Sequence, residues 1–131
     1  MEISRFRFRA AAFFALLAAA GCGRDTAENS REQMHKLFNG LLASAQKNTG
    51  AWPDRLDQVK PYVGGDVEFA LLIKNPLTGD SPGYEYAKPP VGMYATDLGQ
   101  YVILYQLRGG QRDLKAKAAY ADGSVRVPGG K

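Results

Sequence analysis

One side chain in this chain of 131 residues stands out as a candidate for covalent chemistry, the thiol of Cys22. It is the only cysteine, which excludes an intrachain disulfide and a cysteine-rich metal site. It follows directly after an apolar run, residues 10–20, and the small residue Gly21. A free thiol on an exported protein is prone to oxidation, so a cysteine at this boundary favours a modified thiol.

The residues before Cys22 have the order of a secretory signal. Residues 1–9 are basic, residues 10–20 are apolar and Gly21 is small. The apolar run would form a helix of only about 16 Å, roughly half of a bilayer core, so a permanent transmembrane span is not expected. The sequence therefore predicts a signal peptide over residues 1–21.

The segment Ala19-Ala20-Gly21-Cys22 resembles a bacterial lipobox, with Ala19 as an accepted variant of the usual Leu. The resemblance implies that the thiol of Cys22 carries a diacylglyceryl group, that the peptide bond before it is cut, and that the new N-terminus is acylated, for example with palmitate. Two or more acyl chains hold a protein to a membrane far better than one. The alternative is ordinary signal cleavage near Ala20 with an incidental cysteine.

These inferences place the mature chain outside the cytoplasm. We expect residues 22–29 to form the lipidated cysteine with a short polar tether, and residues 30–131 to form one folded domain, a suitable length for a single domain. The membrane is then a partner through the lipid anchor, at the periplasmic face of the inner or outer membrane.

The charge of the chain gives no indication of nucleic-acid binding. The formal net charge is +4, but from Cys22 onward there are 14 Lys/Arg and 12 Asp/Glu, which leaves only +2. The folded part also lacks a basic cluster suited to phosphates. We therefore expect no nucleic-acid partner.

The first element after the tether is an amphipathic helix, predicted over residues 28–48 with Gly50 as its C-cap. A single apolar stripe is expected to face the core and consists of Met34, Leu37, Phe38, Leu41 and Leu42. A second, short helix is predicted to open at Pro53 and to end at Pro61. Trp52 is expected to pack under the turn between these helices.

The rest of the chain favours strands. Alternation from Asp66 onward predicts a strand over residues 67–73, and residues 74–83 are dense in turn formers. Further strands are predicted at residues 84–86, 100–107 (the central strand), 115–121 and 124–127, the last two joined by a type I′ turn at Asp122-Gly123. Helices followed by antiparallel strands predict an α+β fold, with an N-terminal amphipathic helix packed on a small antiparallel β-sheet.

No catalytic constellation is evident. His35, the only histidine, lies beside the apolar stripe and is interpreted as a partly exposed surface residue. The serines do not lie in the sequence pattern of a nucleophile elbow, and the sequence has too few ligands for a zinc site. The acidic pairs have the spacing of residues on helix surfaces or in turns. Asp80 and Asp122 lie in predicted turns and are interpreted as turn formers, not as calcium ligands. We expect no catalytic residues, no cofactor and no metal, hence no enzyme.

Tyrosines are concentrated in the predicted sheet at positions 84, 86, 94, 101 and 105. Cross-strand aromatic pairs stabilise a pleated face, which is the structural interpretation. An exposed aromatic strip would instead bind a glycan such as peptidoglycan, which is the alternative function.

Three segments together resemble bacterial pseudopilin-type (prepilin-like) domains of the kind numerous in planctomycete-type bacteria. They are QKNTGAWPDRLDQVKPYV, NPLTGDSPGYEY and YADGSVRV, in this order within residues 30–127. The resemblance implies a helix packed on an antiparallel sheet and no catalytic residues. A segment that resembles a lipobox lies here where pilins carry a prepilin-peptidase site and a long apolar helix. We therefore expect a non-enzymatic lipoprotein, a structural or accessory component of a secretion or cell-envelope system with a protein partner in the envelope.

Overall fold

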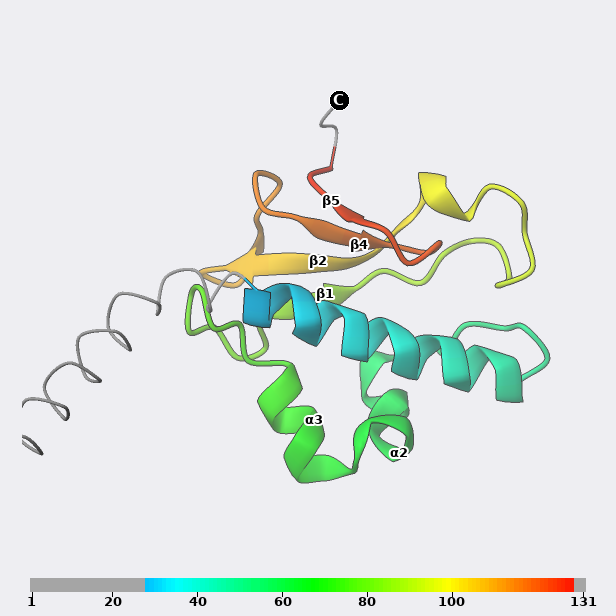
Figure 1. Ribbon diagram of the computed structural model, residues 1–131, viewed down its shortest axis with the longest axis horizontal. Helices are drawn as coiled ribbons and strands as arrows, with labels where there is room; N and C mark the ends of the chain where they lie inside the picture. Colours follow the sequence, from blue (N-terminus) through cyan, green and yellow to red (C-terminus); the bar gives the residue numbers. More distant parts are fainter. Residues whose placement is uncertain (1–27, 129–131) are drawn as a thin grey trace, which may run out of the picture.

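The computed structural model describes residues 28–128, and this part of the chain has the predicted α+β fold (Figure 1). A long helix, residues 28–47, lies along an antiparallel sheet. The shorter helices α2 (Lys60–Val63) and α3 (Asp66–Leu72) lie on the other side of this N-terminal helix. The predicted lipidation site Cys22 and the signal peptide at residues 1–21 lie outside the described residues.

The N-terminal helix confirms the periodicity predicted from the sequence. Its buried face consists of Met34, Leu37, Phe38, Leu41 and Ala45, with Leu42 half-buried at the edge. Its exposed face includes Lys36, Asn39 and Lys47. The helix ends where Thr49 and Gly50 adopt positive φ values of 55° and 93°, and the Gly50 N–H donates to the Ala45 carbonyl at 2.7 Å. A Cβ at Gly50 would lie 2.7 Å from the ring of Tyr94, so a larger residue there would also have to displace this exposed side chain.

Both prolines after this helix have different roles from those predicted. The second helical segment begins as a 3₁₀ turn, η1 (Leu56–Val59), three residues after Pro53, which is itself buried. It continues as α2 (Lys60–Val63), with Pro61 in the first turn and not at the end. Proline is tolerated there because the first turn needs no N–H donor. Trp52 is buried, and its ring centroid lies 6.4 Å from that of Phe38.

The strand predicted over residues 67–73 is wrong, because this segment forms the helix α3 (Asp66–Leu72). Only Phe69 and Leu72, three residues apart, are buried, whereas Val67 and Leu71 are exposed. Acidic residues occupy the first turn, where they stabilise a helix N-terminus. The apparent two-residue alternation therefore mixed a buried face with an exposed one.

The sheet is antiparallel and follows the order β1-β2-β4-β5, with β3 paired to the end of β2. Its strands are β1 (Tyr84–Tyr86), β2 (Val102–Arg108), β3 (Gln111–Arg112), β4 (Ala118–Tyr120) and β5 (Val125–Arg126). A short 3₁₀ turn, η2 (Leu98–Gln100), precedes β2. Because β2 lies between β1 and β4, the prediction that the most apolar segment forms the central strand is confirmed.

The hairpin at Asp122-Gly123 exists, but its turn is not of type I′. Only Gly123 has a positive φ, 92°, whereas Asp122 does not. The Gly123 N–H donates to the Tyr120 carbonyl, and the Tyr120 N–H donates to the Ser124 carbonyl. This is the three-residue hairpin loop, in which a tight turn is followed by one left-handed glycine. The strand before this turn, β4, is shorter than the predicted strand over residues 115–121, because residues 113–117 form a turn.

Candidate functional site

The predicted anchor at Cys22 precedes the first described residue, Glu28, by six positions. The part of the described domain nearest to it in the chain is therefore the start of the N-terminal helix. Two hollows flank this helix end, and a buried group of polar side chains lies beneath it.

Five side chains from four segments form one hydrogen-bonded group, here called the polar cluster: Ser30, Gln33, Asn75, Tyr84 and Gln106. The Tyr84 hydroxyl lies 3.0 Å from Ser30 Oγ and donates to Gln33 Oε1 at 2.8 Å. The single hydroxyl proton of Ser30 is shared between Gln106 Oε1, at 3.3 Å, and the Tyr84 oxygen. The cluster thus ties the helix to β1 and β2.

Asn75 extends the polar cluster into the turn of residues 74–80. It is fully buried, and its Nδ2 donates to Gln106 Oε1 at 3.0 Å. Its Oδ1 accepts the N–H of Leu77 at 2.9 Å. On the other side, Gln106 Nε2 donates to the Lys117 carbonyl at 2.9 Å. Buried polar groups with all partners in place are rigid, so the cluster fixes both the turn and the segment before β4 relative to the helix.

The electrostatics of the polar cluster favour a structural role. Burial raises the pKa of Tyr84 to about 12, against a smaller opposite effect of its hydrogen bond to Ser30. The phenol is therefore neutral at physiological pH and is neither a general base nor a nucleophile. None of the five side chains carries a charge, so the cluster positions the segments around it.

The tyrosines predicted in the sheet do not form one exposed strip. Tyr84 is buried, and the half-buried Tyr86 donates its hydroxyl to the Pro53 carbonyl at 2.6 Å. Tyr101 donates to Asp97 at 3.1 Å, which raises its pKa. Tyr105 lies under the Arg112 guanidinium, 4.2 Å from the ring centroid. Of the five, only Tyr94 is highly exposed, at 74%.

The candidate acid and nucleophile residues are dispersed among structural roles. His35 is half-exposed on the N-terminal helix, as predicted. Asp122 Oδ1 accepts the N–H and the hydroxyl of Ser124, and these bonds lower the pKa of the carboxyl. Asp80 accepts the Gly110 N–H. Both aspartates thus stabilise turns, as the sequence predicts. Within residues 28–128, no group of three His, Cys, Asp or Glu side chains is placed to hold a metal ion.

A hollow of about 640 Å³ lies between β1 and the helical segments η1 and α3. Its walls combine apolar side chains such as Phe69 and Ile73 with charged ones at the rim, including Asp54 and Glu85. Both carboxylates are engaged in ion pairs, Asp54 with Lys88 at 2.6 Å and Glu85 with Arg112 at 3.0 Å. These pairings lower the pKa of each carboxyl group, which keeps both groups ionised.

Sequence reasoning missed an exposed aliphatic surface on α3. Val67 is 75% exposed and Leu71 is 60% exposed, and a spacing of four residues places them on one face of this helix. Tyr62 of the neighbouring helix α2 is also exposed. If residues 66–72 had been predicted as a helix with Phe69 and Leu72 on its buried face, Val67 and Leu71 would have been predicted as exposed apolar residues.

Across the helices that the structure describes, none is sufficiently long and apolar to span a bilayer. Comparisons with known protein families, with curated proteins and with solved structures each found no match for this chain.

Proposed function

We propose that this chain is a non-enzymatic lipoprotein, anchored through Cys22 outside the cytoplasmic membrane, that acts by protein–protein contact as an accessory or structural component of a secretion or cell-envelope system. Its domain is of the pseudopilin type in this proposal. The lipobox-like segment ending at Cys22 supports the anchor, and the helix-on-sheet arrangement supports the domain type.

The observation that carries the proposed contact role is the pair Val67 and Leu71 on α3. Aliphatic side chains that are 75% and 60% exposed on one helix face gain most by being covered, because burial of apolar surface is the main favourable contribution to protein association. The helix α3 lies on the side of the N-terminal helix remote from the sheet, where it is accessible to another protein (Figure 1).

The aromatic glycan-binding alternative lacks a comparable observation. Recognition of a sugar ring by stacking needs accessible aromatic faces. Tyr84 and Tyr86 are held in internal hydrogen bonds, and Tyr105 is covered by Arg112. We therefore favour a protein partner.

Acylation is tested by growing cells with a labelled fatty acid and comparing the wild-type chain with Cys22→Ala. We expect label on the wild-type protein, retention in the membrane fraction, and loss of both in the variant. A second variant, Ala19→Leu, restores the usual lipobox residue and is expected to keep the label. Equal labelling of wild type and Cys22→Ala would contradict the anchor.

The contact role is tested with a photo-reactive amino acid placed at Leu71 and, as a control, at Tyr94, which is more exposed than Leu71 but lies outside α3. We expect a discrete cross-linked band from position 71 that disappears when Val67 is replaced by Ser in the same chain. Cross-linking that is equal at both positions, or that is insensitive to Val67→Ser, would contradict a specific partner at α3.

A further inference from the structure

The end of the domain where the N-terminal helix starts carries an exposed mixture of cations and leucines. It is here called the anchor-end patch and consists of Arg31, Leu77, Leu114, Lys115 and Lys117. Arg31, Leu77, Lys115 and Lys117 line one hollow of about 330 Å³. Leu77 is 45% exposed, and Leu114, adjacent to Lys115, is 58% exposed.

Positive charge is in excess in this patch. Glu28 is the only carboxylate among the residues that line the hollow, against three cations. The nearby Asp113 is already paired with Arg108 at 3.1 Å. Within residues 28–128, Arg31, Lys115 and Lys117 form no ion pair, so their charge is available to an external anion.

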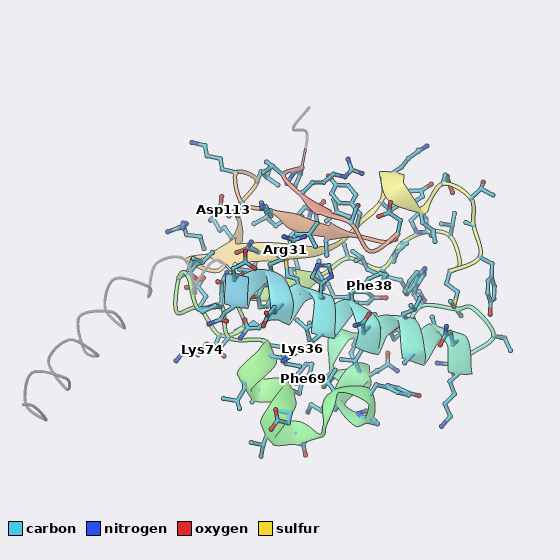
Figure 2. The ribbon with its side chains drawn as sticks, viewed as in Figure 1. Arg31, Lys36, Phe38, Phe69, Lys74 and Asp113 are labelled. Carbon is cyan, nitrogen blue, oxygen red and sulfur yellow. The ribbon has the colours of Figure 1, made fainter. Side chains whose placement is uncertain are left out.

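Three separate segments bring the patch to one end of the molecule. The helix start, the turn of residues 74–80 and the turn of residues 113–117 all lie at the same end of the domain (Figure 1). Figure 2 shows Arg31, Lys74 and Asp113 around this end, so Lys74 adds a further cation near the patch. The polar cluster holds this arrangement, because Asn75 binds the Leu77 N–H and Gln106 binds the Lys117 carbonyl.

We infer that the anchor-end patch lies on the anionic lipid headgroups of the bilayer that holds the acyl chains of Cys22. The inference rests on the proposed lipid anchor. Residues 22–27 span at most about 20 Å when fully extended, whereas the N-terminal helix, residues 28–47, is about 30 Å long. The bilayer surface is therefore in reach of the helix start before any other part of the domain.

The chemistry of the patch matches this occupant. Lysine and arginine side chains attract the phosphates of an anionic leaflet, and leucines between them can enter the boundary between headgroups and acyl chains. Docking at this end would orient the domain with its long helix pointing away from the membrane. The exposed face of α3, Val67 and Leu71, would then lie beside this axis and stay open to a protein partner.

The test uses the mature chain extracted from membranes and reconstituted in phosphatidylcholine vesicles with or without phosphatidylglycerol. With Cys22 acylated, an introduced cysteine is the only free thiol, because the chain has no other cysteine. A nitroxide is attached in Leu77→Cys, or in Tyr94→Cys, which is exposed beside the C-terminal end of the helix at Gly50. Collision rates with oxygen and with a water-soluble nickel complex then report the depth of each label.

We expect the label at position 77 to lie at headgroup depth in vesicles with phosphatidylglycerol and to shift toward water without it or at high salt, because salt screens the attraction. The label at position 94 should remain in water throughout. Charge reversal in Lys115→Glu/Lys117→Glu should abolish the immersion at position 77. The control Lys36→Glu/Lys47→Glu, with the same change in charge on exposed helix positions outside the patch, should not.

Several outcomes overturn the inference. Water exposure of position 77 in every vesicle, equal immersion of positions 77 and 94, or insensitivity to the lysine reversals would each show that the patch is not a headgroup contact. Mass spectrometry of the same sample determines independently whether Cys22 is acylated. An acylated chain whose position 77 stays in water refutes only the docking, whereas an unacylated Cys22 refutes the proposed anchor and with it the placement of this end.

Discussion

The N-terminal helix packs on apolar side chains along its whole length, with Met34 and Leu37 buried in its first half, but its two halves differ in their polar contacts. The first half contributes Ser30 and Gln33 to the polar cluster, in which Tyr84, Gln106 and Asn75 are also paired. The second half packs against an apolar cluster, formed with Phe38, Leu41, Ala45, Trp52 and Val59. In the described residues, the only buried polar side-chain atom without a partner is Nε1 of Trp52, which follows the helix and packs against its second half at Phe38.

The two halves therefore contribute differently to the stability of the domain and to the position of the helix on the sheet. Apolar contacts are non-directional and contribute in proportion to the area that they bury, so the second half supplies stability with some tolerance in geometry. Hydrogen bonds require a donor and an acceptor at defined distances and angles, so the first half fixes the register of the helix on the sheet. The half with the fixed register is the one next to the proposed anchor, where orientation on a membrane matters.

The largest effect is expected from the apolar half, in Phe38→Ala. The ring is 8% exposed and lies against Trp52 and Gly123, so its removal should leave a cavity and lower the free energy of unfolding by about 3–5 kcal/mol. Urea unfolding of the chain without residues 1–22 measures the loss. Lys36→Ala, on the exposed face of the same helix (Figure 2), should change it by less than about 0.5 kcal/mol. Similar losses in both variants would refute the assigned core face.

The polar half should make stability depend on alkaline pH. Burial raises the pKa of Tyr84 from 10.0 to about 12, so the unfolded chain loses this proton at a lower pH than the folded one. The contribution of Tyr84 is therefore full below pH 10 and is lost as the pH rises toward 12, by about 2–3 kcal/mol in total. Tyr86 has a raised pKa, also through burial, and acts in the same direction.

The measurement compares urea unfolding at several alkaline pH values for wild type and Tyr84→Phe. The variant should be less stable at neutral pH, because the hydroxyl bonds to Ser30 and Gln33 are missing, but its stability should fall less steeply above pH 10. Tyr94→Phe, at an exposed position, should keep the wild-type slope. An unchanged slope in Tyr84→Phe would show that this phenol is not protected by burial.

A smaller loss is expected from Asn75→Ala, about 1–3 kcal/mol, because the Leu77 N–H and Gln106 Oε1 each lose a partner. The damage should be local, since amide hydrogen exchange ought to accelerate in residues 76–80 more than in the helix. Asn39→Ala, exposed on the helix, serves as the control. Uniform acceleration over the whole domain would instead mean that Asn75 supports the core and does not position the turn.

The sequence predicted the parts of the fold with strong local signals. The N-terminal helix spans five turns with one unbroken apolar face, and β2 is the most apolar segment after Cys22, so both were identified. The short helix α3 was misread because Val67, Phe69, Leu71 and Ile73 alternate like a strand. Tertiary packing decided the outcome, since only Phe69 and Leu72 found a buried environment on the N-terminal helix.

The polar cluster could not be predicted from the sequence, because its members are distant in the chain. Ser30 and Gln106 are 76 positions apart, and Asn75 and Gln106 are 31 apart. In the sequence, Asn75 lies in a segment rich in turn formers and was interpreted only as one of them, so its buried hydrogen bond to Gln106 was not predicted. Cys22 and its acylation stay predictions, since this residue lies outside the described part of the chain.

The hairpin turn connects to the apolar half through Gly123. This residue has a φ of 92°, and a Cβ there would lie 3.2 Å from the Phe38 ring. Gly123→Val places a β-branched side chain in a left-handed conformation and against a core ring, so we expect a loss of about 1–3 kcal/mol in urea unfolding. In the Phe38→Ala background the steric part should disappear. A loss that is unchanged there would mean that backbone strain alone is responsible.

The smallest effect is expected one residue earlier, in Asp122→Asn. Asp122 Oδ1 accepts the N–H of Ser124 at 3.0 Å and its hydroxyl at 2.7 Å, and an asparagine oxygen can accept both bonds. The free energy of unfolding at neutral pH should therefore change by less than about 0.5 kcal/mol.

The bonds to Ser124 lower the pKa of the Asp122 carboxyl below 3.8, so the contribution of this carboxylate to stability is present above that pH and is lost as the pH falls. The asparagine variant should lack this acid dependence. Added calcium should not change the melting temperature of either protein. If calcium instead raised the melting temperature of the wild type and not of the variant, Asp122 would be a metal ligand and the turn would be a second functional site.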